Sequence, residues 1–216
     1  MIPLLQSFDT VILADGGFPE HEIPLSFLKK ARRIICCDGA AEKLLLFGRE
    51  PDFIIGDLDS ISETLKQRFS PVLFRIAEQE SNDLTKSVRF CVERGWDKIS
   101  TLGATGKRED HTIGNLSLLV DYGKMAQVQM LTDYGVFNPQ YQTAVYESYR
   151  GQQVSIFSLN SPTLLSTKNL AYPLHEQNLT SWWQGTLNEA TDETFGITMG
   201  SGEILVFRKY GKCVFR

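Results

Sequence analysis

The sequence predicts an α/β protein with two domains, a parallel-sheet domain at the N-terminus and a smaller all-β domain after it. Two observations lead to this prediction. Short apolar runs alternate with helical patterns over residues 10–131, and after about Gly135 the pattern changes to an alternation with a period of two. Strands that alternate with helices indicate βαβ units and a mostly parallel sheet. The predicted domains are residues 1–135 and residues 136–216.

The predicted strands of the first domain are short and apolar, and they lie at residues 10–14, 33–37, 52–55, 72–76, 98–102 and 128–131. Helical patterns separate them, at residues 25–31, 40–47, 61–69, 82–93 and 112–122. The fourth helix is the clearest, because its apolar residues recur on one face at helical spacing. Ser81 is its expected N-cap and Gly95 its expected end.

The second domain is expected to contain only strands. Residues 153–159 alternate between polar and apolar side chains. Residues 194–199 and 203–208 are predicted strands joined by Gly200-Ser201-Gly202, which suits a hairpin turn. At roughly 80 residues this domain is close to the lower limit for independent stability, so we expect it to pack on the first domain or on a second copy of the chain.

The composition excludes several classes of protein. The chain has 216 residues, of which 42% are hydrophobic and 22% charged, and these fractions are typical of a globular protein. The formal net charge of −4 provides no general basic field, so we expect no nucleic-acid partner. A phosphate ligand would need local cations, helix N-termini or a metal ion.

The sequence also argues against a membrane protein and a secreted one. No run approaches the roughly 20 apolar residues that cross a bilayer. The N-terminus has no basic segment, unlike a signal peptide. The cysteines lack metal-type spacing and favour a reducing compartment, so we expect the protein in the cytoplasm. They are Cys36, Cys37, Cys91 and Cys213.

Acidic and glycine-rich clusters follow the predicted strands, at the edge where a parallel α/β sheet binds its ligands. Asp15-Gly16-Gly17 follows the first strand, and Asp38-Gly39 follows the second and opens a helix. Small residues at a helix N-terminus let backbone N–H groups approach a phosphate. An ordinary strand-to-helix turn capped by Asp explains either cluster as well, and neither matches the GxGxxG fingerprint of dinucleotide-binding proteins.

Carboxylates gather after the third and fourth strands. Asp57 and Asp59 are two positions apart on an extended segment and point to the same side, where a cation would relieve their repulsion. Oxygen ligands of this kind suit Mg²⁺, although Asp59 could instead cap the next helix. Residues 78–86 follow the fourth strand and contain three further carboxylates and Lys86. They complement a helix dipole, but exceed what one cap needs.

A basic segment, residues 103–115, supplies the cations. It resembles a P-loop only superficially, because its glycines are too close together and Arg108 stands where Ser or Thr should follow the lysine. Lys107 and Arg108 suit phosphate oxygens, whereas His111 alone could equally be a structural histidine. The acidic and basic clusters at one sheet edge together predict Mg²⁺-dependent phosphoryl chemistry.

The same residues resemble the thiamine pyrophosphokinase (thiamin diphosphokinase) family. The matching segments are, in order, Asp38-Gly39-Ala40-Ala41, Gly56-Asp57-Leu58-Asp59-Ser60, Gln79 with Asp83-Leu84-Thr85-Lys86, Gly106–Leu116, Leu170–Leu174 and Gly185–Glu189. The resemblance implies a nucleotide-binding α/β domain followed by a β-sandwich, assembled as a homodimer. It also implies transfer of the pyrophosphoryl group of ATP to the hydroxyethyl oxygen of thiamine, with Mg²⁺ and with release of AMP.

The resemblance implies a role for particular residues of this sequence. The catalytic residues would be Asp57, Asp59 and Asp83, and the metal ligands would be Asp57, Asp59, Glu78 and Asp83. The ATP contacts would be Asp38, Gly39, Lys86, Gly106, Lys107, Arg108, Asp110, His111 and Asn115. The thiamine contacts would be Gln79, Asp83, Trp182 and Asn188, near the dimer interface.

Physical chemistry suits this assignment. Thiamine carries a fixed positive charge, which a net-acidic protein attracts. Trp182 or Trp183 could stack on that cation, although one core and one surface tryptophan would explain the pair as well.

The chain departs from the family's pattern at four positions. Glu78 stands in place of the usual Asp, Asn82 in place of Thr, and Ala40 in place of Gly. Leu187 stands in place of Ser, which removes a hydroxyl that could bond to thiamine.

Two other functions stay open. One is a nucleotide- or thiamine-binding module without catalysis. The other is a haloacid-dehalogenase-type phosphatase, in which an Asp-x-Asp motif supplies the nucleophile. The phosphatase would leave residues 108–115 and the β-rich tail without a role.

Overall fold

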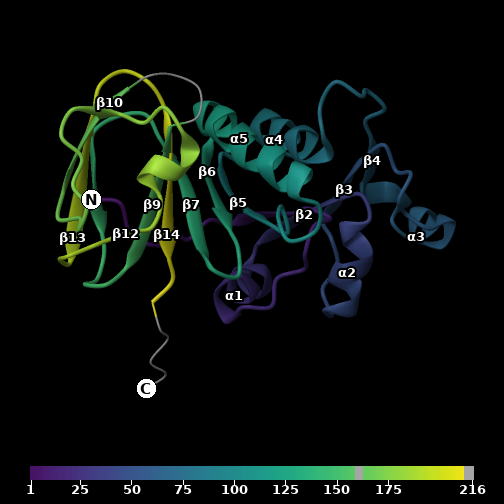
Figure 1. Ribbon diagram of the computed structural model, residues 1–216. Helices are drawn as coiled ribbons and strands as arrows, with labels where there is room; N and C mark the ends of the chain where they lie inside the picture. The colour runs from purple at the N-terminus through teal and green to yellow at the C-terminus, as the bar shows by residue number, and fades with distance from the viewer. Residues whose placement is uncertain (159–162, 212–216) are drawn as a thin grey trace. The chain divides into compact units, whose positions relative to one another are not determined.

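The computed structural model describes residues 1–158 and 163–211, and it divides into two compact units (Figure 1). One unit contains residues 7–133. The other contains residues 1–6 together with the described residues from Tyr134 onward. The expected end of one strand at Leu159 and the predicted free Cys213 lie outside the described residues.

The N-terminal unit is built on six parallel strands. They are β1 (Thr10–Leu13), β2 (Arg33–Cys37), β3 (Phe53–Gly56), β4 (Leu73–Arg75), β5 (Lys98–Leu102) and β6 (Gln127–Leu131). Their order in space is β6-β5-β1-β2-β3-β4. The chain therefore extends the sheet to one side of β1 through β4 and then continues on the other side with β5. Ligands of such sheets bind beyond the carboxyl ends of the two strands where this reversal occurs, here β1 and β5.

Helices cover both faces of this sheet. They are α1 (Glu22–Lys30), α2 (Ala40–Leu46), α3 (Glu63–Arg68), α4 (Asp83–Glu93) and α5 (Glu109–Met125), with a short 3-10 turn at Ser70–Val72. Figure 1 shows α4 and α5 over one face and α1 and α2 over the other. All four residues of β1 are buried, which explains why the central strands read as continuous apolar runs. No described helix is long and apolar enough to cross a membrane.

The start of α4 differs from the prediction by one residue. Asn82, and not Ser81, is the N-cap: its Oδ1 accepts the backbone N–H of Thr85 at 2.9 Å. Ser81 instead donates its hydroxyl and its N–H to the carboxylate of Glu78. Both residue types are good caps, so local propensity alone does not distinguish them.

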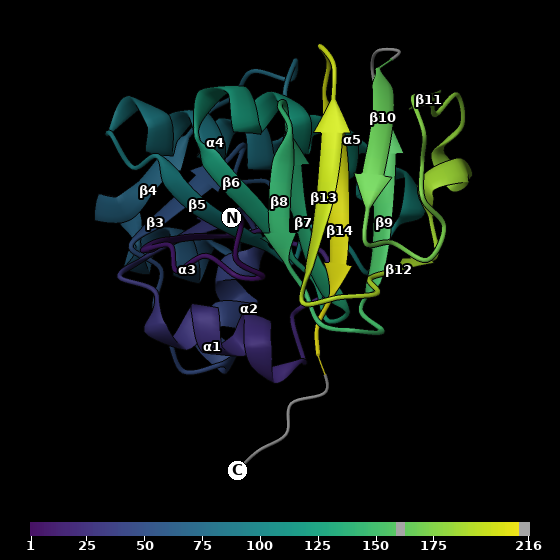
Figure 2. The same ribbon diagram turned by 90° about the vertical axis from the view of Figure 1, so that its left-hand side faces the viewer.

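The C-terminal unit contains two antiparallel sheets, which lie one behind the other in Figure 2. The first has the order β12-β9-β14-β7 and the second β11-β10-β13-β8. The strands are β7 (Gly135–Gln140), β8 (Ala144–Glu147), β9 (Gln153–Ser158), β10 (Leu164–Lys168), β11 (Gln177–Asn178), β12 (Asn188–Glu189), β13 (Thr194–Met199) and β14 (Ile204–Lys209). Both sheets contribute buried side chains to one core, so the predicted combination of an α/β unit with a smaller all-β unit is confirmed.

The hairpin predicted at Gly200-Ser201-Gly202 is wrong. Strand β13 pairs with β10 and β8, whereas β14 pairs with β7 and β9, so the glycine segment connects the two sheets. A strand–turn–strand pattern is the same for a hairpin and for a connection between facing sheets. The pairing partners distinguish them, and the side chains of Ile197 on one sheet and Val206 on the other meet in the shared core.

A buried arginine attaches the first residues of the chain to this unit. The Arg208 guanidinium donates to the carbonyls of Ile2, Pro3 and Leu4 at 3.3, 2.8 and 3.2 Å, and to Asn138 Oδ1 at 2.9 Å. Ile2 also forms backbone hydrogen bonds with β8. Arg208 is fully buried, and this burial lowers its pKa to about 10. It stays charged at neutral pH and bonds to carbonyl dipoles rather than to a carboxylate.

We predict that Arg208→Met lowers the free energy of unfolding by about 2–4 kcal/mol, because the buried Asn138 side chain and the half-buried carbonyls of Pro3 and Leu4 lose their donor. Arg150→Met is the control, since Arg150 forms an exposed ion pair with Asp192 whose loss costs less than about 1 kcal/mol. Urea denaturation of both variants measures the difference. Equal stabilities would show that Arg208 contributes no more than a surface arginine.

Candidate active site

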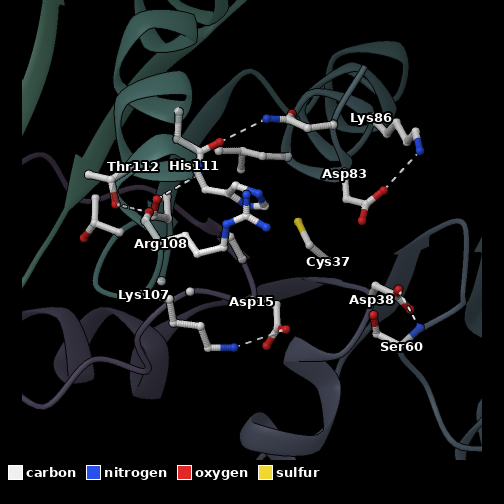
Figure 3. Close-up of a pocket in the computed structure, with 18 of the residues that line it drawn as sticks. Asp15, Cys37, Asp38, Ser60, Asp83, Lys86, Lys107, Arg108, His111 and Thr112 are labelled. Carbon is white, nitrogen blue, oxygen red and sulfur yellow. Dashed lines mark hydrogen bonds and ion pairs between the residues drawn. The ribbon is translucent and has the colours of Figure 1, made fainter. Parts of the chain in front are cut away.

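A cavity of about 420 Å³ lies at the carboxyl ends of the parallel strands (Figure 3). Five segments line it, one after each of the strands β1 to β5, and each contains one of the clusters singled out in the sequence. Figure 3 shows the cationic side chains of Lys107 and Arg108 on one side and the carboxylates of Asp38 and Asp83 on the other.

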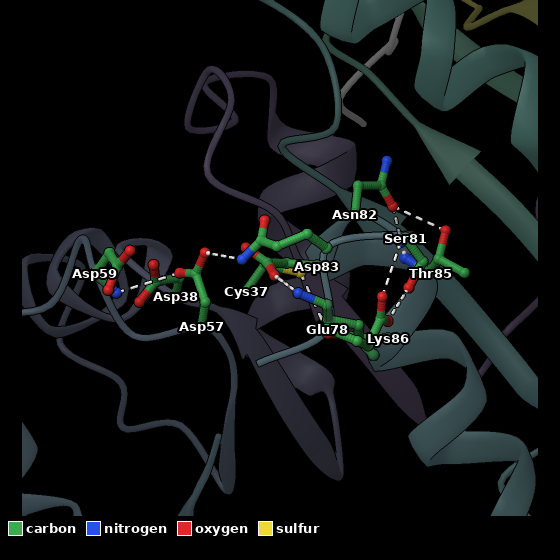
Figure 4. Close-up of polar contacts among 12 residues, drawn as sticks. Cys37, Asp38, Asp57, Asp59, Glu78, Ser81, Asn82, Asp83, Thr85 and Lys86 are labelled. Atoms are coloured by element: carbon green, nitrogen blue, oxygen red, sulfur yellow. Dashed lines mark hydrogen bonds and ion pairs between the residues drawn. The ribbon is translucent and has the colours of Figure 1, made fainter. Parts of the chain in front are cut away.

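Three aspartates form a carboxylate group on the acidic side of the cavity. Each of Asp38, Asp57 and Asp83 offers an oxygen, and these oxygens lie within 4.8 Å of one another (Figure 4). Asp38 follows β2, Asp57 follows β3, and Asp83 is the first residue of α4. Three negative charges at this separation repel strongly, and a divalent cation with oxygen ligands is the group that would relieve the repulsion.

Asp38 is the buried member of this group, with 5% of its surface exposed. Its Oδ2 accepts the backbone N–H of Ser60 at 3.1 Å, while its Oδ1 is buried without a hydrogen-bond partner among the described residues. Burial raises its pKa above the ordinary value for Asp. An orphaned, buried carboxylate oxygen beside two further carboxylates fits a metal ligand, because a bound cation would replace the lost hydration.

The environment of Asp57 favours its ionised form, in contrast to that of Asp38. Its Oδ1 accepts the backbone N–H of Asp59 at 3.2 Å, and its Oδ2 accepts the amide of Gln79 at 3.4 Å. The first of these bonds is the main reason that the pKa of Asp57 is lowered. Leu58 between the two aspartates has a φ of +70°, which turns the loop so that this bond can form.

Asp83 is paired with a lysine of its own helix. The ammonium of Lys86, which is 3% exposed, lies 3.1 Å from Asp83 Oδ1. This buried cation offsets part of the negative charge of the group. Glycine at position 56 gives these carboxylates room to approach. A β-carbon there would stand 3.0 Å from Cβ of Asp38 and 3.3 Å from Cγ of Asp83, which is a tight contact.

Asp59 and Glu78, also predicted as metal ligands, are exposed and lie outside this group of three. The carboxylate of Glu78 accepts the backbone N–H groups of Glu80 and Ser81 at 2.8 and 3.0 Å. The Ser81 hydroxyl contact is the main reason that its pKa is lowered. Their roles toward a metal therefore stay predictions.

The basic side of the cavity comes from the loop between β5 and α5. Lys107 lies 3.4 Å from Asp15 Oδ2. Arg108 forms a bidentate pair with Asp110 at 3.1 and 2.5 Å, which lowers the pKa of Asp110 to about 2. His111 lies in the first turn of α5 and lines the cavity, where helix N–H groups favour an anion.

An amide pair joins the two sides. Asn115 Nδ2 donates to the carbonyl of Ala104 at 2.8 Å, and its Oδ1 accepts from Asn82 Nδ2 at 3.0 Å. Asn82 therefore caps α4 and bonds to α5 at once, a second task that the usual threonine could not perform in the same way. The predicted ATP contact Asn115 is thus fixed by hydrogen bonds within the protein.

The glycines of the β1 and β5 loops pack against each other. The N–H of Gly16 donates to the carbonyl of Gly103, and that of Gly17 to the carbonyl of Thr105, both at 2.7 Å. A β-carbon on Gly16 would overlap the carbonyl oxygen of Gly103. Gly16 and Gly17 therefore allow the two loops to pack closely. Gly39 is the N-cap of α2, and Gly106 has a φ of +88°.

The cysteine that lines this cavity is not activated as a nucleophile. Cys37 lies 3.3 Å from the Ser87 hydroxyl. Burial raises the pKa of Cys37 to about 12, so its thiol stays protonated near neutral pH. The remaining chemistry is that of carboxylates facing cations, which suits a polyphosphate and its metal ion.

Comparison with known proteins identifies the family. A model described as "Thiamin pyrophosphokinase, catalytic domain" matches residues 25–131, and one described as "Thiamin pyrophosphokinase, substrate-binding domain" matches residues 135–207. The chain belongs to the thiamin pyrophosphokinase family. The expectation of an enzyme that forms thiamine diphosphate from thiamine is thereby confirmed.

Curated relatives agree. The chain is 26% identical over 204 residues to "Thiamine pyrophosphokinase 1" of Oryza sativa subsp. japonica, a match that covers 80% of this chain and 77% of that protein. It is 33% identical over 116 residues to "Thiamine pyrophosphokinase" of Bacillus subtilis, which covers 51% of this chain and 54% of that protein.

Solved structures of the family share the fold. A thiamin pyrophosphokinase family protein from Enterococcus faecalis superposes with a TM-score of 0.79 at 18% identity, over 94% of this chain and 99% of that one. Thiamin pyrophosphokinase from Candida albicans gives a TM-score of 0.76 at 19% identity, over 98% and 96% of the two chains.

The residues predicted to contact thiamine fall in both units. Gln79 and Asp83 line the cavity of the N-terminal unit, whereas Trp182 and Asn188 belong to the C-terminal unit. Asn188 is buried, and its amide exchanges hydrogen bonds with the backbone of Tyr172 at 2.7 and 3.0 Å.

Both tryptophans of the pair are exposed. Trp182 is 41% exposed and Trp183 is 72% exposed, so the alternative of one core and one surface tryptophan is wrong. Leu187, which stands in place of the family's serine, is 80% exposed and has a φ of +59°.

Two features of the site were not predicted from the sequence. Asp38 was expected only to contact ATP, yet it completes the carboxylate group. Asp38 lies beside Asp57 because β2 and β3 are neighbours in the sheet, so a correct prediction of the strand order would have placed Asp38 in the group. Lys43, which pairs with Asp15 at 2.6 Å, gave no signal in the sequence.

We predict that Gly16→Ala destabilises the protein by about 2–4 kcal/mol, because the added methyl group would push apart the β1 and β5 loops. Gly114→Ala is the control, since a β-carbon there meets nothing within 4 Å and removes a glycine from the interior of α5. Thermal melting separates the two variants. A Gly16→Ala protein as stable as the Gly114→Ala protein would contradict the close packing of these loops.

Proposed function

We propose that this protein transfers the pyrophosphoryl group of ATP to the hydroxyethyl oxygen of thiamine, with Mg²⁺, and releases AMP. One observation carries the proposal: Asp38, Asp57 and Asp83 face the cationic loop of Lys107 and Arg108 across a single cavity. A metal-bound polyphosphate requires both kinds of charge at once. The family assignment supports the kinase chemistry.

In this proposal, Asp38, Asp57 and Asp83 hold Mg²⁺, with Asp59 and Glu78 as further candidates on their loops. Mg²⁺ held there would supply neutralisation of the negative charge of the polyphosphate while the hydroxyl of thiamine attacks the β-phosphorus and AMP leaves. Lys86 balances the carboxylates, so that the site does not carry their full negative charge without the ion. The Asp59 N–H keeps Asp57 ionised to lower pH than an ordinary Asp, and hence available as a ligand.

The loop after β5 would hold the nucleotide. Lys107, Arg108 and His111 line its side of the cavity, and the first turn of α5 presents backbone N–H groups to an anion. Asp110 fixes the guanidinium of Arg108 through two hydrogen bonds, which reduces the entropy that Arg108 loses on binding phosphate. Positioning and charge neutralisation supply most of the catalysis in such transfers.

We further propose that thiamine binds at the Gln79 and Asp83 end of the cavity. The amide of Gln79 lies beside Asp57, so a hydroxyl placed there would be close to the carboxylate group that can accept its proton. The exposed ring of Trp182 is available for stacking on the thiazolium cation. We propose that the protein is a homodimer and that Trp182 and Asn188 contact thiamine near the dimer interface. We also propose that the enzyme is cytoplasmic, in keeping with the free thiols of Cys36, Cys37 and Cys91.

The test is to incubate the protein with thiamine, ATP and Mg²⁺ and to separate the products by chromatography. Thiamine diphosphate and AMP are expected in equal amounts. ADP or free phosphate without AMP would indicate a phosphatase or another kinase reaction. Absence of turnover would favour a binding module and contradict the proposal.

Asp57→Asn supplies the control, because it removes a proposed metal ligand without changing the size of the side chain. We expect the turnover number to fall by at least about 100-fold. Glu80→Gln, an exposed neighbour that does not line the cavity, should retain turnover. Full activity of Asp57→Asn at ordinary Mg²⁺ concentrations would exclude that ligand.

A further inference from the structure

Asp15 lies between two lysines at the edge of the cavity, and its carboxylate is shared between them. Its Oδ1 is 2.6 Å from the ammonium of Lys43, and its Oδ2 is 3.4 Å from that of Lys107. Lys43 lies on α2, whereas Lys107 lies on the loop before α5. Asp15 and Lys107 both line the cavity, as Figure 3 shows.

The carboxylate of Asp15 is fixed in place. Lys43 also donates to the backbone carbonyls of Asp15 and Gly16, at 3.3 and 2.9 Å, so three acceptors of one short segment hold its ammonium. The next two residues are bound to the β5 loop through their backbone N–H groups. Asp15 therefore cannot follow Lys107 if that side chain moves.

Lys107 is held much less firmly. Its ion pair with Asp15 is long, and its side chain is 52% exposed. A flexible lysine in an exposed pair of this kind gains little from the contact, so a better anion can take it. The phosphate chain of a nucleotide in the same cavity is such an anion.

We propose that Asp15 is a specificity-determining residue that favours the metal-bound nucleotide over the metal-free one. This inference rests on the proposed function, because it assumes that Lys107 binds the polyphosphate. When Lys107 moves to a phosphate oxygen, it leaves the carboxylate of Asp15 facing the bound nucleotide. The resulting repulsion grows with the negative charge of the nucleotide, which is larger without a divalent cation.

The experiment measures the affinity for ATP by calorimetry, once with EDTA and once with excess Mg²⁺, without thiamine so that no turnover occurs. Asp15→Asn removes the charge but keeps an oxygen that accepts from Lys43. We expect it to tighten binding of metal-free ATP by about two- to five-fold, and binding of the Mg²⁺ complex by less. The preference for the Mg²⁺ complex over metal-free ATP should therefore be smaller in the Asp15→Asn protein than in the wild type.

Two further proteins test whether the charge of Asp15 acts on the nucleotide itself. In the Lys107→Met background, Asp15→Asn should still tighten binding of metal-free ATP more than binding of the Mg²⁺ complex, because the carboxylate faces the nucleotide whether or not an ammonium lies beside it. Glu63→Gln breaks an ion pair with Lys66 outside the cavity and should leave both affinities unchanged. Melting temperatures identify any folding defect, and the affinities are compared at a temperature at which every variant is folded.

Each result decides between the alternatives. Unchanged or weaker binding by Asp15→Asn, an equal gain for the two forms of ATP, or a loss of the difference between them in the Lys107→Met background would each overturn the inference while leaving the proposed function intact. A wild-type protein that binds ATP under neither condition would overturn the proposed function and this inference with it.

Discussion

The electrostatic repulsion among the carboxylates of Asp38, Asp57 and Asp83 is the constraint on which the rest of the N-terminal unit depends. The ends of two strands and the start of a helix bring their carboxylates within reach of one ion, and each element makes a local adjustment to do so. Gly56 leaves room for the carboxylates, and Lys86 offsets part of their charge from a buried position. A cluster so constructed costs folding free energy, which is typical of sites shaped for a ligand rather than for stability.

The other side of the cavity is fixed by backbone contacts. Gly16 and Gly17 bond directly to the loop after β5, and this contact sets the distance between the Asp15 carboxylate and Lys107. The amides of Asn82 and Asn115 then join that loop to the start of α4, where the acidic group begins. Positive and negative groups are thereby held apart at a separation that a polyphosphate and its cation can bridge.

Much of this site could be predicted from the sequence, because strand-to-helix loops of a parallel sheet converge on one edge whatever their detail. The alternation of strands and helices predicts the fold class, and the acidic and basic clusters in the loops indicate phosphoryl chemistry. Membership of Asp38 in the carboxylate group depends on which strands are neighbours, and the linear pattern does not contain that information. The same limit explains the error at Gly200–Gly202, since pairing partners decide whether a turn closes a hairpin or connects two sheets. Arg208 gave no signal at all, because a charged residue near the end of a strand is ordinarily exposed.

Crystals grown with ATP and Mn²⁺ in place of Mg²⁺ test most directly whether the three aspartates hold one divalent cation. We expect an anomalous-difference peak among the carboxylates of Asp38, Asp57 and Asp83, at about 2.0–2.3 Å from their oxygens. That peak should disappear in the Asp57→Asn protein. A well-ordered nucleotide with no metal between these carboxylates, or with the metal held only by Asp59 and Glu78, would contradict this expectation.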